Sequence, residues 1–374
     1  MNSYKIITEE KDLRGKRVLL RVDLNVPVSK GKISNDFRIK KTIPTINFLR
    51  NAGAKIIILS HFGRDPKESL EPISEQLNSE IPLKFVPDIF SSEARNVVDS
   101  MQDGEVVLFE NLRRYEQEES NDPEFVAHLS SFGDVYVNEA FSVAHRDHAS
   151  ITGLAKVLPS YAGIRLDEEV SKLSKSFDPP RPFLLIVGGA KFETKLPLIK
   201  KFTTIADKVF IAGALANDVY RFYGLETGKS LVSDTPLSEI AVLLDTERIS
   251  VPEDVVLFSK ENKLSNELSS EDIISDAGSA TVITLSALVK EAKFIVWNGP
   301  LGLYEDGFTE GTDTLMKMIV NSDAESIVGG GDTGLAASKF ENFDEKVFVS
   351  TGGGAMLDFL SEGSLVGIDA LNRD

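Results

Sequence analysis

The chain has 374 residues, which is too long for one small core and suits two domains. It contains no cysteine, which excludes disulfides and thiolate metal sites, and its net charge of −17 argues against nucleic-acid or anionic-membrane partners. No apolar run approaches the length of a membrane span, and the first residues lack the apolar core of a signal peptide. We therefore expect a cytoplasmic protein that binds small molecules.

The first half of the chain alternates short apolar segments with helical patterns. We predict strands at 17–22, 55–60, 105–109 and 134–137, and helices at 44–51, 72–78, 91–101 and 123–132. Strands that alternate with helices imply βαβ crossovers, and hence an α/β fold with a parallel, doubly wound sheet. Ligands of such sheets bind outside the carboxyl ends of the strands.

Most of the predicted strand ends in this half lie next to an arginine or a histidine. The candidates near these ends are Asp23, Leu24, Asn25, Arg38, His61, Phe62, Gly63, Arg64, Arg113 and Arg146. Any one of them is more often a surface or capping residue, but their shared position is not expected by chance. The guanidinium group of arginine can form paired hydrogen bonds to carboxylate and phosphate oxygens. The edge of the sheet that carries these residues, which we call the rim, should therefore hold a small, multiply anionic ligand.

An amphipathic helix predicted at 164–177 is ended by the proline-rich segment 178–182. We interpret 164–182 as the connection and hinge between an N-terminal lobe at 1–163 and a C-terminal lobe at 183–356.

The second half repeats the alternation, with strands predicted at 183–187, 208–212, 294–297, 326–328 and 347–350. Glycine replaces arginine and histidine at the strand ends, and two lysines follow the first of them. The candidates are Gly189, Lys191, Lys195, Gly213, Asn298, Pro300, Gly330, Gly331, Asp332, Thr333 and Gly353. Glycine-rich turns that face helix N-termini favour a nucleotide polyphosphate, and Asp332 is suited to a hydrated Mg²⁺ among the phosphates.

Nine ordered stretches of the sequence resemble the phosphoglycerate kinases, and together they span nearly the whole chain. They are RVDLNVP (21–27), DFRI (36–39), SHFGR (60–64), ENLR (110–113), DVYVNEAFSVAHRDHAS (134–150), GGAK (188–191), VWNGPLG (296–302), GGGDT (329–333) and STGGGA (350–355). The resemblance implies two doubly wound lobes that face a cleft, with residues 357–374 returning to the N-terminal lobe. It also implies a hinge-bending monomer with 3-phosphoglycerate on the N-terminal lobe and Mg-nucleotide on the C-terminal lobe.

The reaction implied by the resemblance is phosphoryl transfer between 1,3-bisphosphoglycerate and ADP, giving 3-phosphoglycerate and ATP. The strand-end residues of the first half, Arg38 among them, would bind 3-phosphoglycerate. Lys191 would stay in contact with the phosphoryl group as it is transferred. Lys195 would bind the nucleotide phosphates, and Glu305 would bind the ribose. Arg38, Lys191 and the turn at Gly353 would be catalytic, and Asp332 would hold the metal.

Departures from the family pattern cluster where the nucleotide base would bind. Ala212 and Ala214 stand where the family usually has glycines, 275–279 lacks the usual Leu and Pro, and Glu193 and Thr194 replace a small residue and an Asp. These changes predict weak discrimination between bases. Two alternatives remain: a ligand-binding paralogue without turnover that acts as regulator or scaffold, and an NAD-dependent oxidoreductase built on GGGDTG at 329–334.

Overall fold

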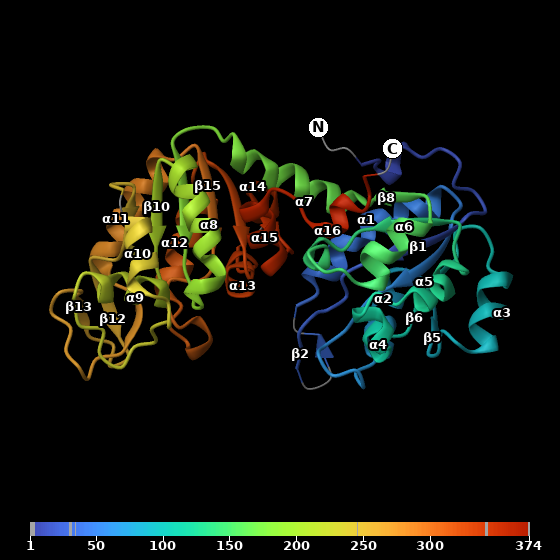
Figure 1. The fold of residues 1–374 in the computed structure, drawn as a ribbon, viewed down its shortest axis with the longest axis horizontal. Coiled ribbons are helices and arrows are strands. Elements are labelled where there is room, and N and C mark those ends of the chain that lie inside the picture. Colours follow the sequence, from blue (N-terminus) through green and yellow to red (C-terminus); the bar gives the residue numbers. More distant parts are fainter. Residues whose placement is uncertain (1–3, 30–31, 34, 245, 341–342, 373–374) are drawn as a thin grey trace. The chain divides into compact units, whose positions relative to one another are not determined.

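The computed structural model describes residues 4–29, 32–33, 35–244, 246–340 and 343–372. The chain forms two compact units, unit 1 (Met1–Ser171 with Ser364–Asp374) and unit 2 (Lys172–Gly363) (Figure 1). The sequence boundary between them falls inside helix α7 (Ile164–Ser174). None of the helices in the described part of the chain is both long and apolar enough to cross a membrane.

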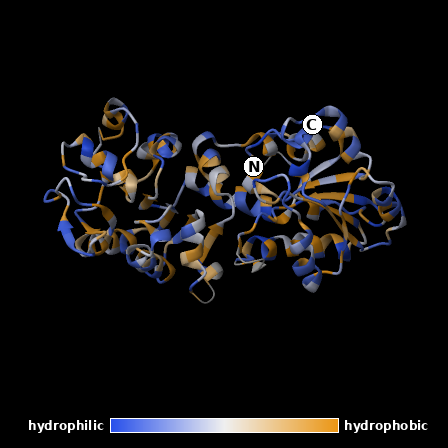
Figure 2. Cartoon of the chain, turned by 90° about the horizontal axis from the view of Figure 1, so that it is seen from below, coloured by the Kyte–Doolittle hydropathy of each residue, from blue (hydrophilic) through white to orange (hydrophobic). Residues whose placement is uncertain are grey.

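Unit 1 is built on a six-stranded sheet in the order β5-β6-β4-β1-β7-β8, and every neighbouring pair is parallel. Its strands are β1 (Arg17–Arg21), β4 (Lys55–Leu59), β5 (Lys84–Val86), β6 (Val106–Phe109), β7 (Val135–Asn138) and β8 (Ser160–Ala162). The central strands are buried along nearly their whole length, because helices cover both faces of a doubly wound sheet. Figure 2 shows this as a hydrophobic sheet between helices with hydrophilic outer sides.

The remaining elements of unit 1 are mostly helices. They are α1 (Phe37–Asn51), α2 (Glu71–Glu80), α3 (Ser92–Ser100), α4 (Glu116–Glu119), α5 (Pro123–Ser130), α6 (Leu154–Val157) and α16 (Val366–Asp369), with a hairpin of β2 (Val28–Ser29) and β3 (Lys32–Ile33). The helix predicted at 44–51 begins at Phe37 instead, because Pro44 lies inside the helix and not in its first turn. Arg38 is therefore a helical residue.

Unit 2 contains a second parallel sheet, in the order β11-β10-β9-β15-β16-β17. Its strands are β9 (Phe183–Val187), β10 (Lys208–Ile211), β11 (Ile249–Ser250), β15 (Phe294–Asn298), β16 (Glu325–Gly329) and β17 (Val347–Ser350). A small antiparallel sheet of β12 (Asp254–Leu257), β13 (Asn262–Leu264) and β14 (Ile274–Ala277) was not predicted. The helices are α8 (Phe192–Ile205), α9 (Ala214–Phe222), α10 (Leu237–Leu244), α11 (Ser279–Glu291), α12 (Glu310–Val320), α13 (Gly331–Ala337), α14 (Phe343–Lys346) and α15 (Gly354–Glu362).

Both large sheets reverse their strand order beside the first strand of the unit. In unit 1 the chain passes from β1 to β4 on one side and later to β7 on the other, and in unit 2 from β9 to β10 and later to β15. Such switch points open a crevice at the carboxyl ends of the strands. The turns after β1, β4 and β7, and those after β9 and β15, are therefore where ligands are expected.

Candidate active site

Asp23 organises the turn after β1. Its carboxylate accepts hydrogen bonds from the backbone N–H of Asn25 at 2.9 Å and from the Ser142 hydroxyl. It also forms an ion pair of 3.0 Å with Arg38, whose guanidinium donates to the carbonyl of Asn25 at 3.0 Å. The predicted residues Asp23, Asn25 and Arg38 thus lie together, and α1 brings the arginine to the strand end.

The turn after β4 carries His61, Phe62, Gly63 and Arg64, and Asn111 fixes it from the turn after β6. The Asn111 side chain accepts from the Phe62 N–H at 3.0 Å and donates to the Phe62 carbonyl at 2.8 Å. Gly63 has a φ of +66°, and its N–H donates to the Asn25 side chain at 3.0 Å. Arg113 donates to the Gly63 carbonyl, so the turns after β1, β4 and β6 are joined.

Arg21 is the main rim residue that the sequence analysis missed. It ends β1 with 1% of its surface exposed, donates to Ser150 Oγ at 2.8 Å, and lies 3.1 Å from His61 Nδ1. The available signal was a charged residue inside an otherwise apolar strand, because a buried guanidinium needs partners. Asn111 and Ser142 were also missed as residues that orient the predicted ones.

The charge of the rim comes from its arginines and not from its histidines. Burial holds the pKa of His61 well below its usual value of 6.5, and the nearby positive charges of Arg21, Arg113 and Arg146 lower it further. Burial, with Arg146, lowers the pKa of His148 to about 4. The histidines are therefore neutral near pH 7, and the arginines provide fixed positive charge for an anion.

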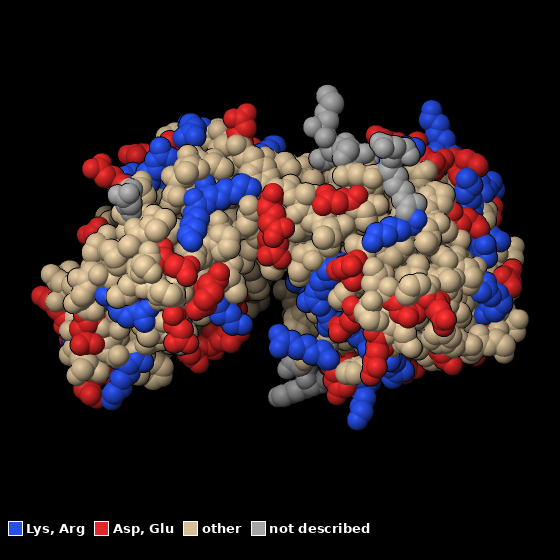
Figure 3. Space-filling model, viewed as in Figure 1, with Lys and Arg blue, Asp and Glu red and all other residues tan. Residues whose placement is uncertain are grey.

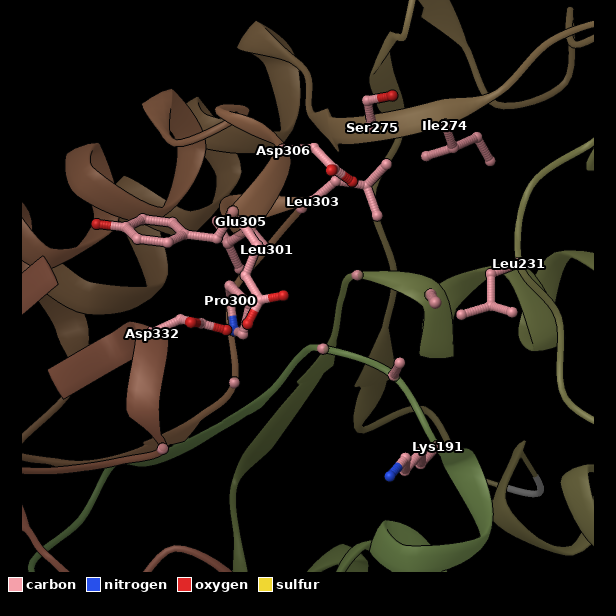
Figure 4. A pocket seen from close by; sticks show the side chains of 18 of the residues that line it. Lys191, Leu231, Ile274, Ser275, Pro300, Leu301, Leu303, Glu305, Asp306 and Asp332 are labelled. Carbon is pink, nitrogen blue, oxygen red and sulfur yellow. The ribbon is translucent and has the colours of Figure 1, made fainter. Parts of the chain in front are cut away.

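Unit 2 contains a cavity of about 710 Å³ at the switch point of its sheet (Figure 4). The predicted residues that line it are Gly189, Lys191, Lys195, Gly213, Asn298, Pro300, Glu305, Gly330, Gly331 and Asp332. Figure 4 shows Glu305 and Asp332 beside Pro300, while Leu231 and Ile274 lie across the cavity from them.

Close backbone contacts shape the floor of this cavity. Gly188 and Gly189 donate their N–H groups to the carbonyls of Asn298 and Pro300 at 2.9 and 2.7 Å. A Cβ on Gly213 would approach the Gly189 nitrogen to 2.6 Å, so only glycine fits there. Lys191 precedes α8 with a φ of +62°, an uncommon conformation for a residue with a side chain.

Burial shifts the titration of two charged groups in the cavity. Lys195 is 7% exposed, its ammonium donates to the Gly188 carbonyl, and burial lowers its pKa to about 8. Burial raises the pKa of Asp332, and the negative charge of Glu305 raises it further. A polyanion would stabilise charged Lys195, and a cation would stabilise charged Asp332.

A magnesium ion held jointly with a nucleotide fits this arrangement. Asp332 lies in the first turn of α13 and lines the cavity. The described residues hold no group of three or more His, Asp or Glu that could bind a metal by themselves. Mg²⁺ commonly takes one or two carboxylates together with substrate phosphates and water, so a single carboxylate suffices.

Two predicted residues lie outside the cavity lining. Thr333 is buried, and its hydroxyl donates to the carbonyls of Gly329 and Gly330, the latter at 3.2 Å. Its side chain therefore closes the turn. Gly353 precedes α15 with a φ of +54°, a conformation that residues other than glycine rarely adopt.

The lining of the cavity is more apolar than the sequence suggested. The apolar side chains that line it are Leu231, Ile273, Ile274, Leu301 and Leu303. Ala214 lines the cavity as expected, whereas Ala212 is fully buried in the core of unit 2 and does not. Leu231 and Ile274 were not predicted, because a loop carries Leu231 and the start of the unpredicted strand β14 carries Ile274, rather than the carboxyl end of a strand in the large sheet.

Asp276 lies within the segment 275–279 that departs from the family pattern, but it keeps the usual Asp of that segment, and its role is structural. It is buried, accepts the N–H of Gly311 at 2.9 Å, and has a pKa raised by burial to about 6. A Cβ on Gly302 would come within 2.7 Å of it, so the carboxyl group packs directly against the loop that bears Leu301 and Leu303.

The chain is similar along nearly its whole length to known proteins. The sequence model of one family, described as Phosphoglycerate kinase, matches residues 8–363. The chain belongs to this family. A curated protein named phosphoglycerate kinase from Wolbachia sp. subsp. Brugia malayi (strain TRS) is 39% identical over 97% of each chain. Another of that name, from Methylorubrum extorquens (strain PA1), is 37% identical over 99% of each.

Solved structures of the family resemble this fold over its whole length. Phosphoglycerate kinase from Pyrococcus horikoshii OT3 matches with a TM-score of 0.88 at 29% identity, and that from Coxiella burnetii with 0.84 at 32% identity. Each match covers 98% of both chains. The predicted family, the two α/β lobes and the kinase class are thereby confirmed, and nothing supports a paralogue without turnover.

Proposed function

We propose that the chain transfers a phosphoryl group reversibly between 1,3-bisphosphoglycerate and ADP, with the rim of unit 1 binding the phosphoglycerate and the cavity of unit 2 binding the Mg-nucleotide. The observation that carries this assignment is that the two switch points present different groups for binding an anion. Unit 1 presents fixed arginine charge, and unit 2 presents glycine turns with a buried lysine and the carboxylates of Glu305, Asp306 and Asp332.

Arginines and backbone groups would recognise the phosphoglycerate. Arg38, held by Asp23, and Arg113, held by Gly63, are oriented before any ligand binds. The neighbouring Leu24, Phe62, Arg64 and Arg146 complete the proposed set. Preorganised guanidinium groups lower the entropy cost of binding a small anion.

The chemical step needs no general base in the direction that consumes ATP, because the attacking carboxylate is already ionised near pH 7. Catalysis then consists of aligning the reactants and neutralising charge on the transferred group. We assign this role to Arg38, Lys191 and the helix N-terminus after Gly353, which come from both units. The units must therefore approach each other around the substrates, and such closure would also exclude water.

The nucleotide phosphates would lie over the glycine turns, with Lys195 and the turn at Gly330, Gly331 and Thr333 beside them. Bound Mg²⁺ would neutralise phosphate charge, and Asp332 is the residue that would hold it. Glu305 would accept hydrogen bonds from the ribose. We further propose a monomer in the cytoplasm without nucleic-acid or membrane partners, in accord with the glycolytic role of the family and the net charge of −17.

The assignment of one substrate to each unit is tested by titration calorimetry. Asp332→Asn should weaken Mg-ADP binding at least about tenfold, since it removes a charge from the metal site, and should leave 3-phosphoglycerate binding within about twofold. Arg64→Ala should do the reverse. If Asp332→Asn weakens both ligands equally, the two-site assignment is wrong.

A further inference from the structure

A buried carboxylate lies beneath the substrate rim of unit 1 and has no role in the proposed chemistry. Glu118, in α4, is 1% exposed. Both of its oxygens accept hydrogen bonds from Ser150, one from the backbone N–H at 3.0 Å and the other from the hydroxyl at 2.5 Å. Burying an ionised carboxylate is costly unless nearby charges and donors compensate.

The compensating charge is Arg21, which Ser150 connects to Glu118. The Ser150 hydroxyl accepts from Arg21 Nε at 2.8 Å and donates to Glu118 Oε1, so it uses its proton toward the acid and a lone pair toward the arginine. Arg21 is equally buried, and Glu118 is its strongest stabilising charge. The acid, the hydroxyl and the guanidinium thus fix one another in a single arrangement.

The Nη2 end of the Arg21 guanidinium determines which ring nitrogen of His61 carries a proton. Arg21 Nη2 lies 3.1 Å from His61 Nδ1. A guanidinium can only donate, so Nδ1 must accept and carries no proton. The charged side chains that act on the ring, Arg21 on β1, Arg38 on α1, Arg113 after β6 and Arg146 after β7, are all cationic. A second proton on the ring is therefore disfavoured from every side.

We propose that Glu118 is a positioning residue for the substrate rim: through Ser150 it orients Arg21, and Arg21 holds His61 as the neutral tautomer with its proton on Nε2. His61 then offers the anionic phosphoglycerate a hydrogen-bond donor of fixed direction. Glu118 itself touches no substrate. The inference rests on the proposed function only for the identity of the ligand.

The tautomer is read directly from the wild-type protein by NMR of ¹⁵N-labelled histidine. We expect His61 Nδ1 to show the shift of an unprotonated nitrogen, unchanged from about pH 5.5 to 8. A proton on Nδ1, or titration of His61 between about pH 6 and 7, overturns the proposal.

Glu118→Gln tests the role of the acid, with Glu116→Gln as matched control, because Glu116 is exposed on the same short helix. For Glu118→Gln we expect the Nδ1 signal to move toward the average of two exchanging tautomers. The KM for 3-phosphoglycerate should rise about fivefold to tenfold, with the KM for Mg-ATP within about twofold. Glu116→Gln should change neither.

Ser150→Ala breaks the same chain at its bridging hydroxyl and should give the same two changes, which keeps the test available if Glu118→Gln does not fold. A folded Glu118→Gln protein with unchanged His61 signal and unchanged KM contradicts the positioning role. A wild-type protein without turnover but with the expected His61 signal contradicts the proposed function alone, because the tautomer does not depend on catalysis.

Discussion

Arg38 is the single side chain whose removal should most reduce turnover. It is held by Asp23 and the Asn25 carbonyl, and its own side chain is 32% exposed, so it contributes little to the core. Removing one preorganised charge from a phosphoryl-transfer site typically costs about 3–4 kcal/mol in the transition state. We expect Arg38→Ala to lower kcat by about 10²–10³ with little change in unfolding free energy.

Lys40→Ala is the control for this variant, because Lys40 is an exposed cation on the same helix, paired with Asp36. Steady-state kinetics measures kcat, and urea denaturation measures the unfolding free energy, for both variants. If Arg38→Ala keeps more than about a tenth of the wild-type kcat, another group neutralises the transferred charge.

The base end of the nucleotide cavity should discriminate poorly between purines. The cavity is lined there by the apolar side chains of Leu231, Ile274 and Leu303 and by the methyl group of Ala214. Apolar surfaces bind any flat ring and reject a changed polar substituent weakly. We predict that kcat/KM for GTP lies within about tenfold of that for ATP. A preference for ATP above about a hundredfold would show that polar groups read the base after all.

Residues next to a predicted strand end could be identified from the sequence because a parallel sheet brings those ends together. His61, Arg113, Gly189 and Asn298 belong to this class. Arg21 was missed because it lies inside the strand, one residue before the turn. Leu231 and Ile274 reach the cavity from distant segments, and no local pattern encodes such contacts.

Among the structural elements, the N-terminus of α7 donates a backbone hydrogen bond to a buried carboxyl group. Glu139 follows β7, accepts the backbone N–H of Arg165 at 3.1 Å and the hydroxyl of Thr45, and is fully buried. Burial raises its pKa to about 8 although these hydrogen bonds oppose the shift. The fold therefore binds the proton of Glu139 more tightly than the unfolded chain does.

This shift predicts the sign of a pH effect on stability. The contribution of Glu139 is fully present below its ordinary pKa of 4.5 and is lost as the pH rises through about 8. We expect the unfolding free energy of unit 1 to fall by the order of a few kcal/mol between about pH 5 and 8, and Glu139→Gln to remove most of this slope.

Urea denaturation followed by circular dichroism at several pH values measures the slope. Glu168→Gln serves as control, since Glu168 is on α7, whose N-terminus Glu139 contacts, and its side chain is 45% exposed. Equal slopes for wild type and Glu139→Gln would mean that the carboxyl group is ionised in the fold at pH 7.

Long buried strands were predictable, and short edge strands were not. Residues 183–187 were predicted as a strand with the bounds that β9 shows, because their continuous apolar run matches burial on both faces. The four-residue edge strand β17 is an exception, since 347–350 was predicted with its observed bounds. β5 and β8 lie at the sheet edges with only three residues each, too short for a pattern. The antiparallel sheet containing β12 was missed because turns and polar residues interrupt its strands.

At the scale of the whole molecule, acidic and basic side chains are intermixed on the surface seen in Figure 3, and the net charge forms no single acidic patch there. The cations that we propose for anion binding are instead gathered at the two switch points. Unit 1 supplies arginines, and unit 2 supplies Lys191 and Lys195. Neither unit has both sets, so we expect each unit alone to bind its ligand without turnover.

We propose that the rim of unit 1 and the cavity of unit 2 serve one phosphoryl transfer. A coupled assay with purified protein, 3-phosphoglycerate and Mg-ATP tests it most directly, with the product detected by glyceraldehyde-3-phosphate dehydrogenase and NADH. We predict NADH oxidation that requires both substrates and that falls by about 10²–10³ in Arg38→Ala. No NADH oxidation by the wild-type protein at saturating substrates would show that the protein does not catalyse this phosphoryl transfer.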